Sequence, residues 1–212
     1  MARGRPQDPE QQEKMKLALM DVMKELLSHK TYKSISIREI AEQAGTYSAM
    51  ISYYFENKEG LVRALVLRTA TERRAILATV AQEVVSAEKD HLSILVNRIL
   101  NTLLKEPWLF RLLQDDLMTS NESFKQFFLD NFISVVVSGI QQLLTLLQQN
   151  KIIRADVNIK FMVPTLMGLI SFPILAQPIV KDALGLDLEV LKSKEWQEHI
   201  SQVLTSHLTS TL

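Results

Sequence analysis

Cysteine is absent from this 212-residue chain, and glycine and proline are scarce, with six of each. Without cysteine the chain has no disulfide framework, no thiolate metal site and no catalytic thiol. We also find no alternation of apolar and polar residues long enough to predict a β-sheet, no internal repeat and no low-complexity tract. Because 47% of the residues are apolar, a chain of this length is expected to bury an adequate core. These features predict an all-α fold.

The sequence also lacks the motifs of the common enzyme classes. It contains no GxSxG elbow, no phosphate-binding glycine loop and no HExxH. Glu88 and His91 form a single Glu-x-x-His, whereas a carboxylate-bridged di-metal site in a helical bundle needs a matched pair. His29, His199 and His207 have no such partner in the sequence. We therefore predict a protein without enzyme activity, cofactor or bound metal.

Charge is balanced over the whole chain, with 24 Lys and Arg against 24 Asp and Glu, but it is not evenly distributed. Residues 1–74 carry 13 basic and 10 acidic side chains, and the rest of the chain carries 11 and 14. A small positive excess thus lies in the N-terminal third, where a nucleic-acid-binding domain would need it. The polar sequence of residues 1–16 lacks the apolar core of a signal peptide, so a cytoplasmic location is expected.

One uncharged stretch, residues 161–180, is long enough to span a bilayer. Pro164, Pro173 and Pro178 argue against a membrane span, because lipid cannot replace the hydrogen bonds that proline removes. The alternative is a helix buried in the protein or at a subunit interface. We expect no association with a membrane.

Residues 34–61 predict two short helices joined by a tight glycine turn. Ser36 is followed three residues later by Glu39, the spacing of a capping box, so a helix is expected from about residue 37. Gly45 lies where a helix end commonly needs a left-handed residue, and Ile51 would anchor a second helix over residues 48–55. Asn57 is placed to cap the next helix. This spacing favours a helix-turn-helix that binds DNA, and the alternative is an ordinary helical hairpin with its tyrosines in a core.

Two segments, IREIAEQAG at residues 37–45 and YYFENKEGL at residues 53–61, resemble the TetR family of transcriptional regulators. The close resemblance covers roughly residues 3–67, and the rest of the chain fits the family in helix content and length. The resemblance implies a three-helix DNA-binding domain over residues 1–56 and a larger helical effector-binding and dimerisation domain over residues 57–212. It also implies a regulator, by the family's usual habit a repressor, that binds a palindromic operator as a homodimer.

Helical patterns continue along the chain on both sides of the motif. The first predicted helix carries an apolar stripe that would brace the helix-turn-helix, and a long helix after Asn57 would link the two domains. Outside residues 34–57, helices are expected near residues 9–29, 58–85, 90–105, 107–117, 122–149, 157–176, 179–184 and 194–208.

The resemblance assigns the residues that contact double-stranded DNA. The second helix of the motif would enter the major groove, Arg38 is the best candidate for a bidentate contact with guanine, and Lys58 would bind phosphate. For Tyr54 the alternative is core packing beside Phe55, and for the basic N-terminal arm it is a solvated terminus. The full expected set is Arg3, Arg5, Ser36, Arg38, Tyr47, Ser48, Ala49, Met50, Ser52, Tyr53, Tyr54 and Lys58.

The reading face departs from the family pattern at two positions. Tyr47 stands where the family often has Ser or Thr, and Ser52 stands where it often has Tyr. The operator sequence therefore does not follow from the resemblance.

A homodimer is expected because one such module makes a small interface with DNA and useful affinity usually takes two half-sites. The resemblance implies a four-helix bundle built from the uncharged helix and the last helix of each subunit, and the alternative is that the apolar stripe packs within its own chain. The predicted interface residues are Met167, Ile170, Ile174, Trp196, Ile200, Val203, Leu204 and Leu208.

The resemblance further implies an effector pocket in the larger domain. Few charges lie near its candidate residues, so we expect a small hydrophobic or amphipathic ligand whose binding weakens DNA affinity. Each residue taken singly is also a plausible core residue, and a regulator controlled by a protein partner instead is the alternative function. The candidates are Asn97, Asn101, Trp108, Phe110, Gln114, Met118, Phe124, Phe128, Met162, Met167 and Phe172.

Overall fold

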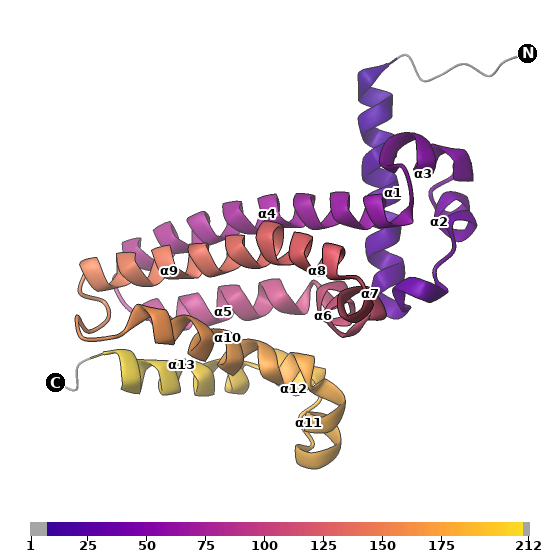
Figure 1. Ribbon diagram of the computed structural model, residues 1–212. Helices are drawn as coiled ribbons and strands as arrows, with labels where there is room; N and C mark the ends of the chain where they lie inside the picture. The colour runs from indigo at the N-terminus through magenta and orange to yellow at the C-terminus, as the bar shows by residue number, and fades with distance from the viewer. Residues whose placement is uncertain (1–7, 210–212) are drawn as a thin grey trace, which may run out of the picture. The chain divides into compact units, whose positions relative to one another are not determined.

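The computed structural model describes residues 8–209, and every regular element in this range is helical. The predicted all-α class is confirmed (Figure 1). Arg3 and Arg5, assigned to the N-terminal arm, lie outside the described residues. The α-helices are α1 Pro9–His29, α2 Ile37–Gln43, α3 Ser48–Phe55, α4 Lys58–Ser86, α5 His91–Leu104, α6 Pro107–Gln114, α7 Asp116–Ser120, α8 Glu122–Phe128, α9 Ser134–Gln149, α10 Ile159–Leu175, α11 Gln177–Leu184, α12 Leu188–Lys192 and α13 Lys194–Leu208. A 3-10 turn, η1, covers Tyr32–Ser34, and a π-helical segment, η2, covers Leu129–Ile133.

Most helix boundaries follow the sequence signals. The ranges predicted for α1, α3 and α13 are confirmed, and Asp8 and Ser193 cap α1 and α13 through their side chains. The helix expected over residues 107–117 instead ends at Gln114, because the Asp115 carboxylate accepts the Leu117 N–H and starts α7. The short helix α12, capped by Asp187, was not expected. The run predicted over residues 122–149 is helical but contains the π-helical segment η2 in its first half.

The chain divides into two compact units that differ from the expected domains. The N-terminal unit contains the described residues up to Ala70 together with residues 108–133, and the second unit contains residues 71–107 and the described residues from 134 onwards. The boundary expected after residue 56 therefore separates segments that belong together, because the first half of α4 and all of α7 and α8 pack in the same unit as the helix-turn-helix.

The N-terminal unit buries large side chains from its two segments. From the first segment Leu19, Met23 and Ile51 are fully buried, and from the second Trp108 and Phe128 are. Burying an aromatic ring of this size removes about 150–250 Å² from water, which makes these side chains major contributors to the core. Residues 108–133 are thus an integral part of the unit that carries the helix-turn-helix.

The second unit is built around one hydrophobic cluster from α4, α5, α9, α10 and α13. This cluster corrects the predicted dimer interface. Ile170, Ile200, Leu204 and Leu208 are at most 2% exposed and belong to the chain's own core, so they form no surface for a second subunit. Val203 alone of the predicted set is well exposed, at 41%. Their helical spacing is the same for a core stripe and an interface stripe, which is why the sequence did not separate them.

The uncharged stretch of residues 161–180 is not one straight helix. The chain bends by 75° between α10 and α11, at a break beside Ala176. Within the described residues, this bent pair and the continuous run Glu122–Gln149 have the length and composition of a membrane span, which core helices of soluble proteins also have.

Candidate DNA-reading site

The helix-turn-helix scaffold forms as its sequence predicts. Ser36 Oγ accepts the Glu39 N–H at 3.0 Å and caps α2. At the other end Gly45 has φ +65°, and the N–H groups of Thr46 and Gly45 donate to the carbonyls of Ala41 and Glu42 at 2.9 and 3.2 Å. This is the Schellman arrangement, which satisfies the carbonyls at a helix end.

Only half of the expected capping box forms. The Glu39 carboxylate binds the Lys30 ammonium, and this bond lowers the pKa of Glu39. Glu39 thus ties α2 to the end of α1. Spacing alone predicted the backbone cap and missed this second partner.

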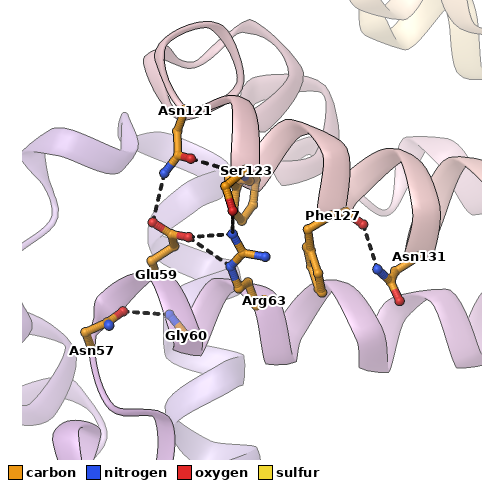
Figure 2. Close-up of polar contacts among 9 residues, drawn as sticks. Asn57, Glu59, Gly60, Arg63, Asn121, Ser123, Phe127 and Asn131 are labelled. Atoms are coloured by element: carbon orange, nitrogen blue, oxygen red, sulfur yellow. Dashed lines mark hydrogen bonds and ion pairs between the residues drawn. The ribbon is translucent and has the colours of Figure 1, made fainter.

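The turn between α3 and α4 is tighter than the sequence suggested. Glu56 adopts φ +67°, and the Asn57 N–H donates to the Phe55 carbonyl at 2.7 Å across it. This three-residue turn is a classic γ-turn, which is a rare and strained type. Asn57 Oδ1 then accepts the Gly60 N–H at 2.9 Å, which confirms the predicted cap (Figure 2).

Gly60 is required by close packing, which the sequence analysis did not detect. A Cβ at this position would lie 1.9 Å from the carbonyl oxygen of Phe55, the last residue of α3. The first turn of α4 therefore rests directly on the end of α3. A glycine three residues after a helix-capping asparagine was the available signal.

The outward face of α3 presents most of the predicted reading residues. Tyr47 is 68% exposed and Tyr53 is 48% exposed. Ser48, Ala49 and Ser52 are also exposed, whereas Ile51 and Phe55 are buried beneath them. Two aromatic side chains thus flank three small ones, a surface on which a groove of DNA can approach the helix backbone closely.

Met50 and Tyr54 turn partly inward. Tyr54 is half-buried, its ring lies edge-on to that of Phe55 at 6.3 Å, and the Lys16 ammonium lies 5.9 Å from the ring centre. Its hydroxyl is buried without a hydrogen-bond partner among the described residues, and burial raises the pKa of Tyr54. For Tyr54 the structure favours the packing alternative over a contact with the DNA backbone.

Arg38 is highly exposed and already paired. Its Nε donates to Glu42 Oε1 at 2.6 Å, and this bond raises the pKa of Arg38. The terminal nitrogens are the donors that a bidentate contact with guanine uses. The side chain of Arg38 is 84% exposed, so water screens the pair with Glu42 and the arginine can exchange this partner for another.

Lys58 has a structural role that the sequence analysis did not predict. Its ammonium donates to the carbonyls of Tyr32 and Ile35, both at 2.8 Å, and lies 4.0 Å from the centre of the Tyr32 ring. Burial lowers the pKa of Lys58, and the charge of Asp115 partly opposes this. Two of its three N–H donors are thus engaged within the protein, which leaves little of the side chain for phosphate.

Asp115 completes this corner of the unit. It is 7% exposed, and its Oδ2 accepts the Tyr32 N–H at 2.7 Å. The residue that starts α7 therefore holds the turn that precedes the helix-turn-helix.

A family profile described as "Bacterial regulatory proteins, tetR family" matches residues 19–65. The uncharacterized HTH-type transcriptional regulator YvkB of Bacillus subtilis (strain 168) is 39% identical over 59 residues. The matched segment covers 28% of this chain and 31% of that relative. Residues 19–65 are therefore similar to the TetR family in sequence, and the matched segments cover less than a third of the chain.

Solved structures of regulators match nearly the whole chain in fold. FadR from Bacillus halodurans, a regulator of fatty acid degradation, has a TM-score of 0.71 at 16% identity, covering 94% of this chain and 96% of its own. FadR from Bacillus subtilis in complex with stearoyl-CoA has a TM-score of 0.69 at 16% identity, and the match covers 90% of this chain and 97% of that protein. Reduced NemR from Escherichia coli has a TM-score of 0.72 at 15% identity, and the match covers 93% of this chain and 99% of that protein. At such identities the likeness shows the fold alone.

The structure separates the residues predicted to form an effector pocket. Trp108, Phe124 and Phe128 are fully buried in the N-terminal unit. In the same unit Met118 is buried and Phe110 is half-buried. They are core residues of the unit that carries the helix-turn-helix. Gln114 lies in the same unit and is exposed.

The other predicted pocket residues lie in the second unit. Met162 is buried in its core and Met167 packs against it, but Phe172 is 60% exposed. Asn97 and Asn101 are exposed on α5, where the Asn101 amide donates to Asn97. The expectation that the two asparagines anchor a ligand in a buried pocket is not met by their exposed positions.

Two hollows lie in the described part of the second unit. The larger is an open groove of about 950 Å³ between α4 and α9, whose lining includes Arg74, Leu77 and Gly139. The smaller, of about 370 Å³, lies around residues 148–155. No predicted effector-pocket residue lines either hollow.

Proposed function

We propose that this protein is a TetR-family transcriptional repressor that reads a palindromic operator as a homodimer and releases it when a small hydrophobic or amphipathic effector binds. The exposed face of α3 carries the proposal. There Tyr47, Ser48, Ala49, Ser52 and Tyr53 face outward from a helix whose other side is anchored in the core. Such a helix fits the major groove of B-DNA, and its side chains reach base edges.

The proposed readout has two parts. Arg38 would contact a guanine through its terminal nitrogens, and the side chains of α3 would contact the neighbouring base pairs. Ser36 and Tyr53 would contact phosphate, which positions the protein without selecting a sequence. Lys58 is removed from this set because its ammonium is engaged by the carbonyls of Tyr32 and Ile35.

The exposed faces of the two expected helices, α10 and α13, support the homodimer, although half of the predicted residues on these helices are buried. On α10 the exposed residues Phe161, Pro164, Gly168 and Phe172 recur at helical spacing, and Phe161 and Phe172 are 67% and 60% exposed. On α13 Trp196, His199 and Val203 form a similar exposed or half-exposed row. Large exposed apolar side chains in one row mark an interaction surface.

Gly168 strengthens the case for a helix-to-helix contact. A Cβ on Gly168 would meet no atom within 4 Å in the chain itself, so internal packing does not require a glycine there. A second subunit that packs against this point would bring helix backbones close together.

The proposed effector class follows from the apolar character of the second unit. A hydrophobic or amphipathic molecule suits an apolar helical domain, and the fold is shared with FadR from Bacillus subtilis, which was solved with stearoyl-CoA. Control by a protein partner is the alternative, and the open, largely uncharged groove between α4 and α9 is the feature that favours it.

Selection of DNA fragments by the purified protein, followed by sequencing, tests the function. We expect enriched sites with two inverted half-sites, and we expect Arg38→Ala to lose about 1–3 kcal/mol of discrimination at one position of each half-site. Arg98→Ala is the matched control, because Arg98 is also an exposed arginine paired with a carboxylate, Glu83, but lies in the second unit. If the protein enriches no sequence, the proposal fails.

Stearoyl-CoA, with coenzyme A and stearate as controls, is the first effector probe. We expect an effector to raise the melting temperature and to release the selected operator. If no amphipathic probe does either, a protein-controlled regulator becomes the better description.

A further inference from the structure

A cluster of polar side chains joins the first two turns of α4 to α8 within the N-terminal unit (Figure 2). On α4, Arg63 Nε and Nη2 bind Glu59 Oε1 at 2.8 and 2.7 Å. Beside α8, Asn121 donates to Glu59 Oε2 at 2.9 Å, and Ser123 Oγ accepts from Arg63 Nη2 at 3.2 Å. Each charged group therefore has one partner on its own helix and one at the start of α8.

Aromatic rings of α8 complete the site around Arg63. The guanidinium carbon lies 4.5 Å from the ring centre of Phe127 and 5.4 Å from that of Phe124. The side chains of Arg63 and Glu59 are only 25% and 30% exposed, so water screens these contacts less than it would on an open surface. Arginine suits this position because its planar group donates at its edge and stacks on its face at the same time.

At one end the cluster is in close contact with the last residue of α3, the helix proposed to read DNA. Glu59 precedes Gly60, whose Cα lies against the Phe55 carbonyl at the end of α3. Asn57 binds both the Phe55 carbonyl and the Gly60 N–H. A shift of the first turn of α4 must therefore move the end of α3.

At the other end the cluster meets the π-helical segment η2. The Asn131 side chain donates to the Phe127 carbonyl at 2.8 Å (Figure 2). The ring centres of Phe128 and Phe132, which stack on each other, lie 5.1 Å apart. Short π-helical segments are rare and frequently lie at functional sites.

We propose that Arg63 is a positioning residue for DNA recognition, holding α8 and its π-helical segment against the base of α4 so that α3 keeps the orientation that reads DNA. The proposal rests on the DNA-binding function proposed above. Arg63 touches no base or phosphate in this role. It raises the fraction of molecules whose reading helix is correctly placed, and the apparent affinity follows that fraction.

Operator binding of full-length Arg63→Met, measured over a range of salt concentrations, tests this role. We expect affinity about 5- to 30-fold below the wild type, the factor that corresponds to the loss of one partly buried contact. The salt slope should stay unchanged, because no phosphate contact is lost. Arg98→Met, which breaks the exposed Arg98–Glu83 pair of the second unit, is the control and should bind like the wild type.

A second variant protects the test against simple misfolding. Phe127→Leu keeps the Arg63–Glu59 pair and an apolar side chain but removes the aromatic face. We expect a smaller loss of affinity, and we expect the double variant Arg63→Met, Phe127→Leu to bind no more weakly than Arg63→Met alone, because both act through one contact. Arg63→Lys should recover part of the affinity, since it keeps the charge.

Unchanged operator affinity in Arg63→Met would overturn the proposal, and so would a salt slope reduced by about 1, which would make Arg63 a phosphate contact. Amide hydrogen exchange over residues 48–55 separates this failure from failure of the DNA-binding function. If the wild type selects no DNA, faster exchange of α3 in Arg63→Met still supports the positioning role, and unchanged exchange refutes it.

Discussion

Gly60→Ala should destabilise the N-terminal unit although the residue lies in a helix, where alanine is normally preferred. Alanine in place of glycine in a helix usually contributes up to about 1 kcal/mol. Here the new Cβ would lie 1.9 Å from the Phe55 oxygen and 3.1 Å from its carbonyl carbon. Both are backbone atoms of a tight turn, so neither can move away cheaply.

The expected net effect follows from these two opposing contributions. Overpacking against a rigid neighbour costs about 1–3 kcal/mol, often at the upper end when backbone must shift. After the helix preference is subtracted, we expect a loss of about 1–2 kcal/mol. For a chain of this size that corresponds to a melting temperature lower by about 2–8 °C.

The chain contains two matched controls for this experiment. Gly168 lies in the middle of α10 with open space around its Cα within the chain. In a Phe172→Glu background, which removes the proposed subunit contact on this helix, Gly168→Ala should therefore raise the melting temperature by a few degrees, corresponding to about 0.5–1 kcal/mol. Gly139 is intermediate, because its Cβ would meet the tip of the Leu77 side chain at 2.5 Å. Leu77 can change rotamer at a cost of about 0.5–1.5 kcal/mol, so Gly139→Ala should change stability little.

Differential scanning calorimetry of the three variants measures these melting temperatures and tests the predicted order. Relative to the parent protein of each variant, we expect Gly60→Ala to melt lowest and Gly168→Ala highest. Gly60→Ala should also bind the operator more weakly, because the end of α3 has moved. A Gly60→Ala protein that melts at or above the wild-type temperature would show that the close approach of α4 to Phe55 does not hold in solution.

Two further predictions concern Lys58 and the dimer surface. Lys58→Met should lower the free energy of unfolding by about 1–3 kcal/mol, because the Tyr32 and Ile35 carbonyls lose a charged donor, and it should leave the salt slope of DNA binding unchanged; a stable variant with a slope reduced by about 1 would restore the phosphate role. Phe172→Glu should give a monomer in sedimentation equilibrium at micromolar concentration, whereas Ile76→Glu, a change at another exposed apolar residue on α4, should remain dimeric. A wild-type monomer, or a dimeric Phe172→Glu, would contradict the proposed surface.

Local sequence signals determined the helix-turn-helix almost completely. Ser36, Gly45 and Asn57 act at helix ends, where the identity of one residue satisfies or constrains a few neighbouring backbone groups. Such effects need no knowledge of distant residues. For the same reason the ends of α1, α3 and α13 could be predicted, and the outward position of Tyr47 and Tyr53 followed from helical periodicity.

Tertiary structure decided every question that depends on what covers a helix face. Ile200 and Leu204 form the same stripe whether a second subunit or the chain's own α5 lies against them, and only the fold shows that it is the chain itself. The sequence likewise gives no sign that Lys58 has a partner, and only the fold places the carbonyls of Tyr32 and Ile35 beside its ammonium.

The unit boundary has the same physical cause. Residues 108–133 are far from the helix-turn-helix in the sequence, yet Trp108, Phe124 and Phe128 are fully buried in its unit. A single chain determines which residues are apolar and with what period. Which of them meet depends on contacts over large sequence separations, and these contacts exist only in the folded molecule.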